Sequence, residues 1–310
     1  MALKQSQYIW LDGEFVAWSE AKVHVLSHSL HYANSAFEGL RAYPTDKGLA
    51  IFRLQDHTKR LLNTCKMSLL KCPYDEKTLN EAQVEALRKN SFAPKTSVYI
   101  RPIVFVGYGV MGVYHLNSPI SAAIAAWEWG AYLGDEGLEN GIRVKISSWT
   151  RNSVKSMMGK AKVAANYLNS QMAKCEAIEA GYDEALLLDS EGFVAEGSGE
   201  CFFIVRDGVL ITPPSDNSLE SITQNTVIEI AAALGVRVER RRITRDEVYI
   251  ADEAFFTGTA AEITPVREVD SRTIGEGKRG ALTKRLQEAY FDVVYGRDST
   301  FARFLTFIKD

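Results

Sequence analysis

Hydrophobic and polar residues alternate along much of the 310-residue chain, and their spacing switches between the period of a strand and that of a helix. Alternating or continuous apolar runs bounded by turn residues predict strands. These runs lie at residues 8–11, 15–18, 40–43, 49–53, 98–106, 121–129, 142–146, 184–188, 201–205, 209–212 and 254–256. Asp12-Gly13 and Asp207-Gly208 supply the positive φ values of a tight turn and therefore predict hairpins.

Apolar residues at helical spacing predict helices over residues 56–67, 78–89, 162–180, 223–234 and 279–295. Thr244-x-x-Glu247 matches a capping box and predicts a further short helix. In the segment 162–180, one apolar stripe is expected to face the core, with Gly181 at the C-terminal cap. The stripe consists of Val163, Tyr167, Leu168, Met172, Cys175 and Ile178. Both halves of the chain mix strands and helices, which predicts an α/β (α+β) fold.

The length of the chain favours two domains. At 310 residues it exceeds the roughly 250–300 residues at which single hydrophobic cores stop growing. Glycines and acidic residues gather between Trp129 and Gly141, which makes this stretch the best candidate for a linker. We therefore expect a smaller N-terminal domain at residues 1–133, an interdomain linker at 134–141 and a larger C-terminal domain at 142–310.

Charge and composition exclude several classes of protein. Lys and Arg number 36 against 39 Asp and Glu, so the net charge is −3 and nothing indicates a nucleic-acid partner or an anionic membrane. No stretch has the ~18 uninterrupted apolar residues of a membrane helix, and the first residues do not resemble a signal peptide. The four cysteines form no CxxC pair and have no His at metal-ligand spacing. They indicate reduced, mostly buried thiols in a cytoplasmic protein without a metal.

Candidate chemistry concentrates in the second half of the chain. Lys162 follows a small, polar run at residues 152–160, and Lys155 and Lys160 are close in sequence. A lysine attacks carbonyls when burial or neighbouring positive charge lowers the pKa of its ammonium group, although a solvated surface lysine is the commoner interpretation. Glu196 precedes a Gly-Ser-Gly run that lets a ligand approach closely; a turn with a solvated carboxylate is the alternative.

Three further features could bind an anion. Residues 221–223 open a predicted helix, where N–H groups and hydroxyls form a phosphate site, or where Ser221 is simply an N-cap. Residues 257–261 form a second small, hydroxyl-rich turn, and Arg60 could clamp a phosphate or remain a surface charge. A reactive lysine, a carboxylate for the pyridine nitrogen and a phosphate cup are together what pyridoxal phosphate requires.

Five motifs in one order resemble the bacterial branched-chain amino-acid aminotransferases, which are class IV aminotransferases of the fold-type IV pyridoxal-phosphate enzymes. The motifs are YANSAFEGLRAY at 32–43, YIRP at 99–102, WGAYLG at 129–134, KVAANYL at 162–168 and GTAAEITPV at 258–266. The resemblance covers roughly residues 8–291. It implies a two-domain fold with pyridoxal 5'-phosphate in the interdomain cleft and a cofactor-binding C-terminal domain.

The resemblance also implies a role for each cofactor residue. Lys162 would bind the cofactor covalently and carry the proton between the substrate and the cofactor. Tyr167 would hydrogen-bond the 3′ oxygen, Glu196 would pair with the pyridinium nitrogen, and Leu219 would pack on the ring. The phosphate would be held by Arg60, Ile222 (through its backbone), Thr223 and Thr259.

For the substrate, the resemblance implies a pocket that accepts both apolar and acidic side chains. Arg101 would meet the distal carboxylate of glutamate or 2-oxoglutarate at the rim of a mostly aromatic wall. The α-carboxylate would be held by Tyr99 and the Thr259/Ala260 turn. The wall would contain Phe37, Trp129 and Tyr132, with Tyr32 and Val113 from a neighbouring subunit. Gly39 and Arg41 complete the expected substrate-binding set.

The implied activity is ping-pong transamination of L-leucine, L-isoleucine and L-valine with 2-oxoglutarate, as in the biosynthesis of these amino acids. Branched-chain 2-oxo acids and L-glutamate would be the products, and shared pocket residues would require a homodimer at minimum, with a hexamer (trimer of dimers) expected. D-amino-acid aminotransferases, (R)-amine transaminases and a lyase share the fold, but Arg101 and the 32–43 motif favour the branched-chain reaction. A non-enzymatic sensor would have lost Lys162 or Glu196, and a hydrolase would need a nucleophile elbow that is missing.

Three residues depart from the pattern of the family. Cys201 stands where the family usually has Asn, so its local contacts are open. Ser221 and Gln224 replace the usual Gly and Arg of the phosphate turn, which removes flexibility and one positive charge. We expect somewhat weaker cofactor retention without loss of function. The loop at 107–112 also differs, which could shift the substrate range.

Overall fold

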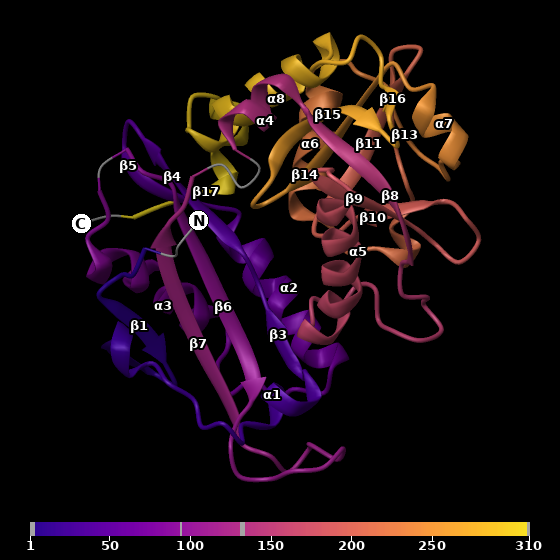
Figure 1. The fold of residues 1–310 in the computed structure, drawn as a ribbon. Coiled ribbons are helices and arrows are strands. Elements are labelled where there is room, and N and C mark those ends of the chain that lie inside the picture. The colour runs from indigo at the N-terminus through magenta and orange to yellow at the C-terminus, as the bar shows by residue number, and fades with distance from the viewer. Residues whose placement is uncertain (1–3, 94, 131–133, 309–310) are drawn as a thin grey trace. The chain divides into compact units, whose positions relative to one another are not determined.

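A computed structural model describes residues 4–93, 95–130 and 134–308 (Figure 1). The chain divides into two units: unit 1 comprises Met1–Gly130, Ala161–Ala165 and Val293–Asp310, and unit 2 comprises Ala131–Lys160 and Asn166–Asp292. Each unit contains a β-sheet and helices. The predicted α/β (α+β), two-domain class is therefore confirmed.

The sheet of unit 1 has the strand order β17-β5-β4-β6-β7-β1-β2, with β3 also paired to β6. Its strands are β1 (Tyr8–Leu11), β2 (Glu14–Ala17), β3 (Ser35–Phe37), β4 (Leu40–Thr45), β5 (Gly48–Phe52), β6 (Val98–Val106), β7 (Ile120–Glu128) and β17 (Leu305–Phe307). Asp12 and Gly13 have φ values of 47° and 101°, which confirms the predicted tight turn between β1 and β2.

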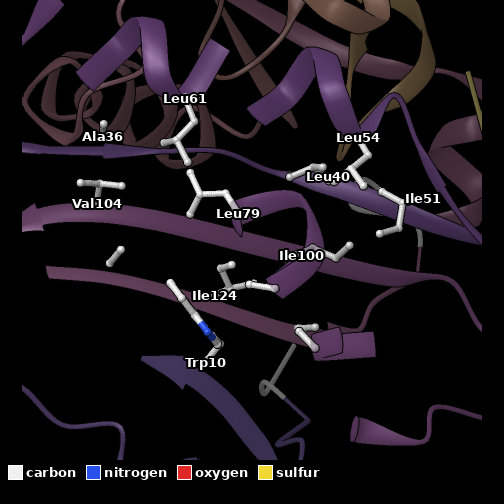
Figure 2. Packing of buried hydrophobic residues seen from close by; sticks show 14 of the residues in the cluster. Trp10, Ala36, Leu40, Ile51, Leu54, Leu61, Leu79, Ile100, Val104 and Ile124 are labelled. Carbon is white, nitrogen blue, oxygen red and sulfur yellow. The ribbon is translucent and has the colours of Figure 1, made fainter. Parts of the chain in front are cut away.

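The helices that accompany this sheet are α1 (His28–Tyr32), α2 (Leu54–Met67) and α3 (Glu76–Asn90), with a 3-10 turn at Trp18–Glu20. Leu61 of α2 and Leu79 of α3 pack with Ile100 of β6 in one buried hydrophobic cluster (Figure 2). Leu40, Ala42, Ala122, Ile124 and Ala126 of the neighbouring strands belong to the same cluster. The even-numbered positions of β4, β6 and β7 therefore face α2 and α3.

The pleat of the same strands carries the odd-numbered positions to the opposite face. Arg41 of β4 pairs with Tyr99 of β6, and Tyr99 pairs with Trp127 of β7. Because side chains alternate along a strand, this row of polar and aromatic residues points away from the core. A functional surface can be built on that face without disturbing the packing beneath it.

The sheet of unit 2 has the order β10-β9-β8-β15-β14-β11-β12-β13, with β16 paired to β15. Its strands are β8 (Ile142–Thr150), β9 (Glu184–Leu188), β10 (Val194–Gly197), β11 (Cys201–Arg206), β12 (Val209–Thr212), β13 (Val238–Arg240), β14 (Glu253–Gly258), β15 (Glu262–Val269) and β16 (Arg272–Thr273). Strand β8 runs parallel to both of its neighbours. The core contains Phe202, Phe256 and Leu186.

The helices of unit 2 are α4 (Asp135–Asn140), α5 (Tyr167–Glu179), α6 (Ile222–Ala233), α7 (Arg245–Tyr249) and α8 (Ala281–Val294), whose last residues belong to unit 1. The predicted linker at 134–141 thus contains a short helix. The Thr244 side chain accepts the Glu247 N–H, which confirms the predicted cap of α7. The regular structure does not end at α8, because a 3-10 segment (Ser299–Phe304) and β17 follow it.

The prediction for residues 162–180 is wrong in two respects. Helix α5 begins only at Tyr167, after a 3-10 turn at Ala164–Asn166. Its buried residues are Ser170, Ala173 and Ala177, whereas Leu168 and Ile178 of the predicted apolar stripe are 65% and 53% exposed. Small side chains let α5 approach β8 and β9 closely, so the larger ones are left outside.

The cysteines follow the prediction only in part. None of the four forms a disulfide; Cys65 and Cys201 are buried and Cys72 is half-buried, but Cys175 is exposed on α5. In the part of the chain that the structure describes, no helix is both long and apolar enough to cross a membrane. The same residues contain no group of three or more His, Cys, Asp or Glu suited to a metal ion.

The packing of α5 can be tested by two substitutions at adjacent positions. Ala177→Leu inserts methylene groups where the side chain is 1% exposed, and we expect it to lower the free energy of unfolding by about 1–3 kcal/mol. Ile178→Gln, at an exposed position, is the control and should change it by less than about 0.5 kcal/mol. Urea unfolding followed by circular dichroism measures both, and the reverse order of effects would support the predicted stripe instead.

Candidate functional site

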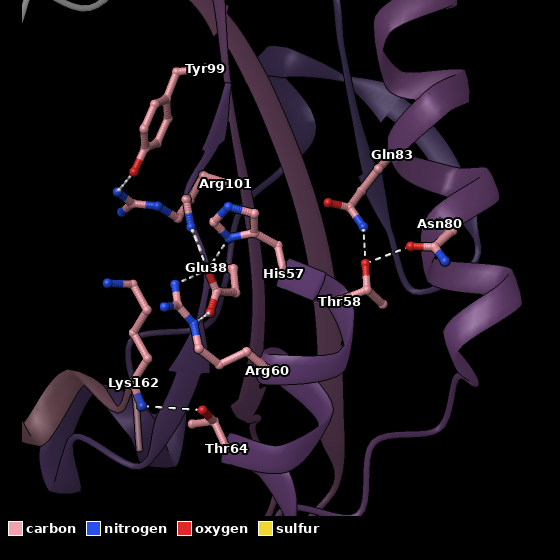
Figure 3. Close-up of polar contacts among 11 residues, drawn as sticks. Glu38, His57, Thr58, Arg60, Thr64, Asn80, Gln83, Tyr99, Arg101 and Lys162 are labelled. Atoms are coloured by element: carbon pink, nitrogen blue, oxygen red, sulfur yellow. Dashed lines mark hydrogen bonds and ion pairs between the residues drawn. The ribbon is translucent and has the colours of Figure 1, made fainter. Parts of the chain in front are cut away.

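Lys162 lies in an extended segment that unit 1 holds by its backbone (Figure 3). Its N–H donates to Oγ1 of Thr64 at 3.1 Å, and its carbonyl oxygen accepts the N–H of Phe37 at 3.1 Å. The next residue, Val163, forms an antiparallel bridge with Ala36. The Lys162 Nζ lies 5.2 Å from the centroid of the Phe37 ring. The segment is fixed on both sides, and the lysine precedes α5 rather than opening it.

Arg60, predicted as a phosphate clamp or a surface charge, is neither free nor solvated. Its Nε and Nη2 donate to the two carboxylate oxygens of Glu38 at 2.6 and 2.9 Å, and its side chain is 13% exposed. His57 Nδ1 lies 2.8 Å from the same carboxylate. Glu38 and His57 are 0% and 1% exposed, so the surface-charge interpretation of Arg60 is wrong.

The charges of this cluster follow from its partners. Burial by itself would raise the pKa of Glu38, but the Arg60 guanidinium and the hydrogen bonds from His57 and Arg60 hold that pKa well below its usual range. Burial lowers the pKa of His57, and the charges of Arg60 and Lys162 add to this, against the opposing effect of Glu38. Glu38 is therefore ionised and His57 neutral near pH 7, with the imidazole proton on Nδ1.

Sequence reasoning missed Glu38 and His57, although a signal was present. Ala36, Glu38 and Leu40 alternate with Phe37 and Gly39, and the first and last of the three are core residues. An acid at a core-facing position of this alternation requires buried partners. His57 and Arg60, three residues apart on α2, supply them.

On the opposite face of the sheet, four of the predicted pocket residues lie together. The Arg101 Nη2 donates to the Tyr99 hydroxyl at 3.1 Å, and its guanidinium carbon lies 4.8 Å from the centroid of the Phe37 ring. The Tyr99 ring centroid is 4.7 Å from that of Trp129 and 5.0 Å from that of Trp127. Trp127 was not predicted, although its two-residue spacing from Trp129 places both on one face. Tyr132 lies outside the described residues.

Gly39 makes room for the Tyr99 ring on this face, and Arg41 bonds to the chain beyond β7. A Cβ on Gly39 would lie 1.9 Å from the Tyr99 hydroxyl oxygen, so only glycine leaves the Tyr99 ring in place. Arg41 is 3% exposed, and its Nη2 donates to the Gly130 carbonyl at 2.7 Å. The arginine therefore holds the chain just beyond β7, next to Trp129.

In unit 2, Glu196 belongs to β10 and is 7% exposed. Its Oε1 lies 2.6 Å from Nε of Arg151, and its Oε2 accepts the Leu219 N–H at 3.4 Å. The interpretation as a solvated carboxylate in a turn is therefore wrong. Arg151, which the sequence did not single out, is 7% exposed and forms a buried ion pair with Glu196.

The start of α6 explains two of the departures from the family pattern. Ser221 caps the helix, since its Oγ accepts the Gln224 N–H at 3.1 Å. The Gln224 Nε2 donates to Oγ1 of Thr212 at 2.8 Å, and both residues are buried. Thr223 is 2% exposed, and Ile222 is 8% exposed. The predicted cup thus contains a capped helix start whose glutamine side chain points into the sheet.

Cys201 also has a definite partner. Its Sγ donates to the Leu219 carbonyl at 3.8 Å, within reach of a sulfur hydrogen bond. The same Leu219 donates its N–H to Glu196. Leu219 is therefore tied to both β10 and β11, and the thiol supplies one of those contacts. Elsewhere in unit 2, Thr259 and Ala260 form the half-buried turn between β14 and β15, and Tyr167 is half-buried at the start of α5.

Glu184 and Glu200 are further buried carboxylates of unit 2. Glu184, 0% exposed, pairs with the Nζ of Lys174 at 2.6 Å. Glu200, 5% exposed, accepts the Gly199 N–H at 3.0 Å. Burial, and then the charge of Glu184, raises the pKa of Glu200 to about 8. Glu200 is therefore mainly protonated at pH 7.

Tyr32 and Val113 lie on an exposed apolar surface of unit 1. Val113 is 87% exposed and Tyr32 is 44% exposed. His28 of α1 connects their segments, because its Nε2 lies 2.8 Å from the Gly112 carbonyl oxygen and its ring centroid lies 4.5 Å from that of Tyr32. Further exposed apolar residues of segments 23–32 and 108–114 are Val23, Val25, Leu26, Leu30, Tyr108, Val110, Met111 and Tyr114.

The chain is similar in sequence to known proteins over most of its length. A family profile described as "Amino-transferase class IV" matches residues 35–269. A branched-chain-amino-acid aminotransferase of Pseudomonas aeruginosa is 52% identical over 301 residues, covering 97% of each chain, and one of Escherichia coli strain K12 is 45% identical, covering 96% of each.

Solved structures of aminotransferases also resemble this chain in fold. A branched-chain amino acid aminotransferase of the organism abbreviated T.th., with pyridoxamine 5'-phosphate, superposes with a TM-score of 0.95 at 50% identity, covering 98% of this chain and 99% of that one. The same protein complexed with N-(5'-phosphopyridoxyl)-L-glutamate gives 0.94 at 49% identity with the same coverage.

The protonation of Glu200 can be tested with an isosteric amide. The unfolded carboxyl ionises near pH 4.5 and the folded one near pH 8, so Glu200 costs stability as the pH rises between these values. Glu200→Gln removes this cost. The difference in free energy of unfolding, variant minus native protein, should therefore rise by more than about 1.4 kcal/mol from pH 5 to pH 8. Urea unfolding at both values measures the difference; a constant difference would mean that folded Glu200 is ionised at pH 5.

Proposed function

The chain belongs to the class IV aminotransferases, and we propose that it transfers the amino group of L-leucine, L-isoleucine and L-valine to 2-oxoglutarate with pyridoxal phosphate as its cofactor. The observation that carries this proposal is the placement of Lys162, whose backbone is bound on both sides and whose amine lies beside the Phe37 ring. The branched-chain names of the relatives support the substrate class.

The residues of both units fit the chemistry of this cofactor. Arg60 of unit 1 offers a buried guanidinium for a phosphate, and the start of α6 in unit 2 offers backbone N–H groups and the Thr223 hydroxyl. We propose that Ile222, Thr223 and Thr259 are phosphate-binding residues, as is Arg60. Glu196, which lies 2.6 Å from the Arg151 guanidinium, is the proposed partner of a protonated pyridine nitrogen.

Pyridoxal phosphate supplies, when bound, an electron sink that lets the Cα proton of an amino acid leave. In the proposed reaction, the Lys162 Nζ would hold the cofactor and, once free, would carry the proton that leaves the substrate Cα. Fixing the lysine backbone leaves only its side-chain torsions to move the amine, which suits a group that changes partner. Tyr167 is proposed to hold the 3′ oxygen, and Leu219 to pack on the ring.

The pocket residues of unit 1 suit substrates of two kinds. Phe37, Tyr99 and Trp129 present aromatic surface to an apolar side chain. Arg101 lies against Phe37 and Tyr99 and can meet a distal carboxylate. We propose that Tyr99 and the Thr259/Ala260 turn hold the α-carboxylate. One pocket that takes leucine and 2-oxoglutarate in turn implies a ping-pong reaction with branched-chain 2-oxo acids and L-glutamate as products.

We propose that two copies of the chain share this pocket. The support is the exposed apolar surface around Tyr32 and Val113, which a monomer would leave in water. Covering such a surface with a second copy would bury it and give each pocket residues from its neighbour. A homodimer is then the minimum unit, and the hexamer and the cytoplasmic location expected from the sequence stay predictions.

The role of Lys162 can be tested by absorbance. Purified protein should carry the visible absorbance of a lysine-bound cofactor, and L-leucine, but not D-alanine, should convert it to the amine form. Lys162→Ala should lose this absorbance and turnover together, because the amine that binds the cofactor is absent. A band that responds chiefly to D-alanine would keep the fold and contradict the branched-chain assignment. Turnover that survives in the variant would contradict the role of the lysine.

The role of Arg101 can be tested by comparing two substrates. Arg101→Met keeps an apolar side chain against Phe37 but removes the charge. The kcat/KM for 2-oxoglutarate should fall at least about 30-fold, the equivalent of about 2 kcal/mol, since a charge-assisted contact is lost. The kcat/KM for L-leucine should change less than about threefold, since leucine has no distal carboxylate. Equal losses for both substrates would refute the assignment.

A further inference from the structure

Helix α2 carries a buried polar stripe that its role in the core does not explain. His57, Arg60 and Thr64 occur at positions i, i+3 and i+7, so they share one face of the helix. His57 and Thr64 are 1% and 0% exposed, and the Arg60 side chain is 13% exposed. Burying such groups costs stability unless each is bonded. Their partners are Glu38 for the first two and the backbone of Lys162 for the third.

Glu38 is the centre of this arrangement (Figure 3). Its two oxygens receive the fork of Arg60 at 2.6 and 2.9 Å. The oxygen that lies 2.9 Å from Nη2 also lies 2.8 Å from His57 Nδ1 and accepts the Gly39 N–H at 3.2 Å. A two-pronged contact fixes the plane of a guanidinium as well as its position. Because Glu38 is itself held by His57 and Gly39, the orientation of Arg60 is set by several elements of unit 1.

We propose that Glu38 is a positioning residue for Arg60: it fixes the guanidinium in the orientation that binds the cofactor phosphate, and His57 holds Glu38 in place. This inference rests on the proposed function and extends it to two residues that the motifs assigned no task. Glu38 carries the counter-charge of Arg60, so the pair has no net charge. Its affinity for phosphate would therefore come from the fixed direction of the guanidinium N–H groups rather than from net charge.

The two possible roles of Glu38 predict opposite effects of its removal. If Glu38 acted only through its charge, Glu38→Gln would leave Arg60 uncompensated and strengthen the binding of an anionic phosphate. If Glu38 positions Arg60, the amide offers one acceptor oxygen in place of two, and its NH₂ group opposes a donor of Arg60 or His57. The guanidinium would then lose its fixed plane, and phosphate binding would weaken.

The experiment compares two probes on full-length protein by equilibrium dialysis: pyridoxal phosphate, and pyridoxal, which lacks the phosphate. Glu38→Gln should raise the Kd for pyridoxal phosphate about tenfold or more, the range of a charge-assisted hydrogen bond. The Kd for pyridoxal should change less than about twofold. Arg60→Met should show the same phosphate-specific loss, and the double variant should be no weaker than Arg60→Met, since both changes remove one interaction.

His57 provides matched controls that keep Glu38. His57→Asn retains an N–H near the place of Nδ1 and should bind pyridoxal phosphate within about twofold of the native protein. His57→Leu removes that donor and should weaken binding severalfold, again only for the phosphorylated probe. This pair tests the inference even if Glu38→Gln fails to fold.

The inference would be overturned by an unchanged or lower Kd in Glu38→Gln, by an equal loss for both probes, or by losses that add in the double variant. An unaltered Kd in Arg60→Met would overturn it as well, because Arg60 would not then bind the phosphate. Failure of the proposed function is distinct, since the native protein would then bind neither probe through Lys162.

Discussion

Lys162 is held by its backbone, through one hydrogen bond to the Thr64 hydroxyl and one from the Phe37 N–H. These bonds, with the bridge between Ala36 and Val163, attach a five-residue segment to helix α2 and to strand β3, which come from another part of the chain. Extended backbone whose N–H and C=O groups are paired in this way has little freedom to shift. The point of attachment of the Lys162 side chain is therefore fixed, and only its own torsions move the amine.

Because side chains alternate along a strand, residues 36–41 contribute to both faces of the sheet. Ala36, Glu38 and Leu40 face α2, while Phe37, Gly39 and Arg41 serve the opposite face. The charged cluster of Glu38, His57 and Arg60 therefore lies on the buried side of the strand. The aromatic side chains around Tyr99 lie on the other side. If residues 36–41 shifted by one position along the sheet, the two sets of side chains would exchange faces. Both the core and the aromatic face therefore depend on the register of this strand segment.

The elements with strong periodicity were predictable, and most strands and helices were confirmed within one or two residues. The failures have physical causes. Residues 162–166 carry helix-forming residues, but the backbone of Lys162 and Val163 pairs with β3, a long-range contact that no local pattern records. In α5, close packing selected Ser170, Ala173 and Ala177 for the buried face over larger apolar residues. Arg151 was missed because an ion pair between distant segments leaves no mark on sequence spacing. Glu38 and His57 were missed although Glu38 stands at a core-facing position of the strand alternation.

The buried carboxylates show how a bonded partner can outweigh the effect of burial on the charge of an acid. Glu38 and Glu196 each face an arginine, and Glu184 faces Lys174. Glu200 is equally buried but accepts a backbone N–H, and its pKa rises to about 8. Desolvation favours the neutral form of a buried acid, and a bonded cation reverses that preference. The ionised form of Glu38 suits the orientation of Arg60, whereas a neutral Glu200 avoids a further negative charge near Glu184.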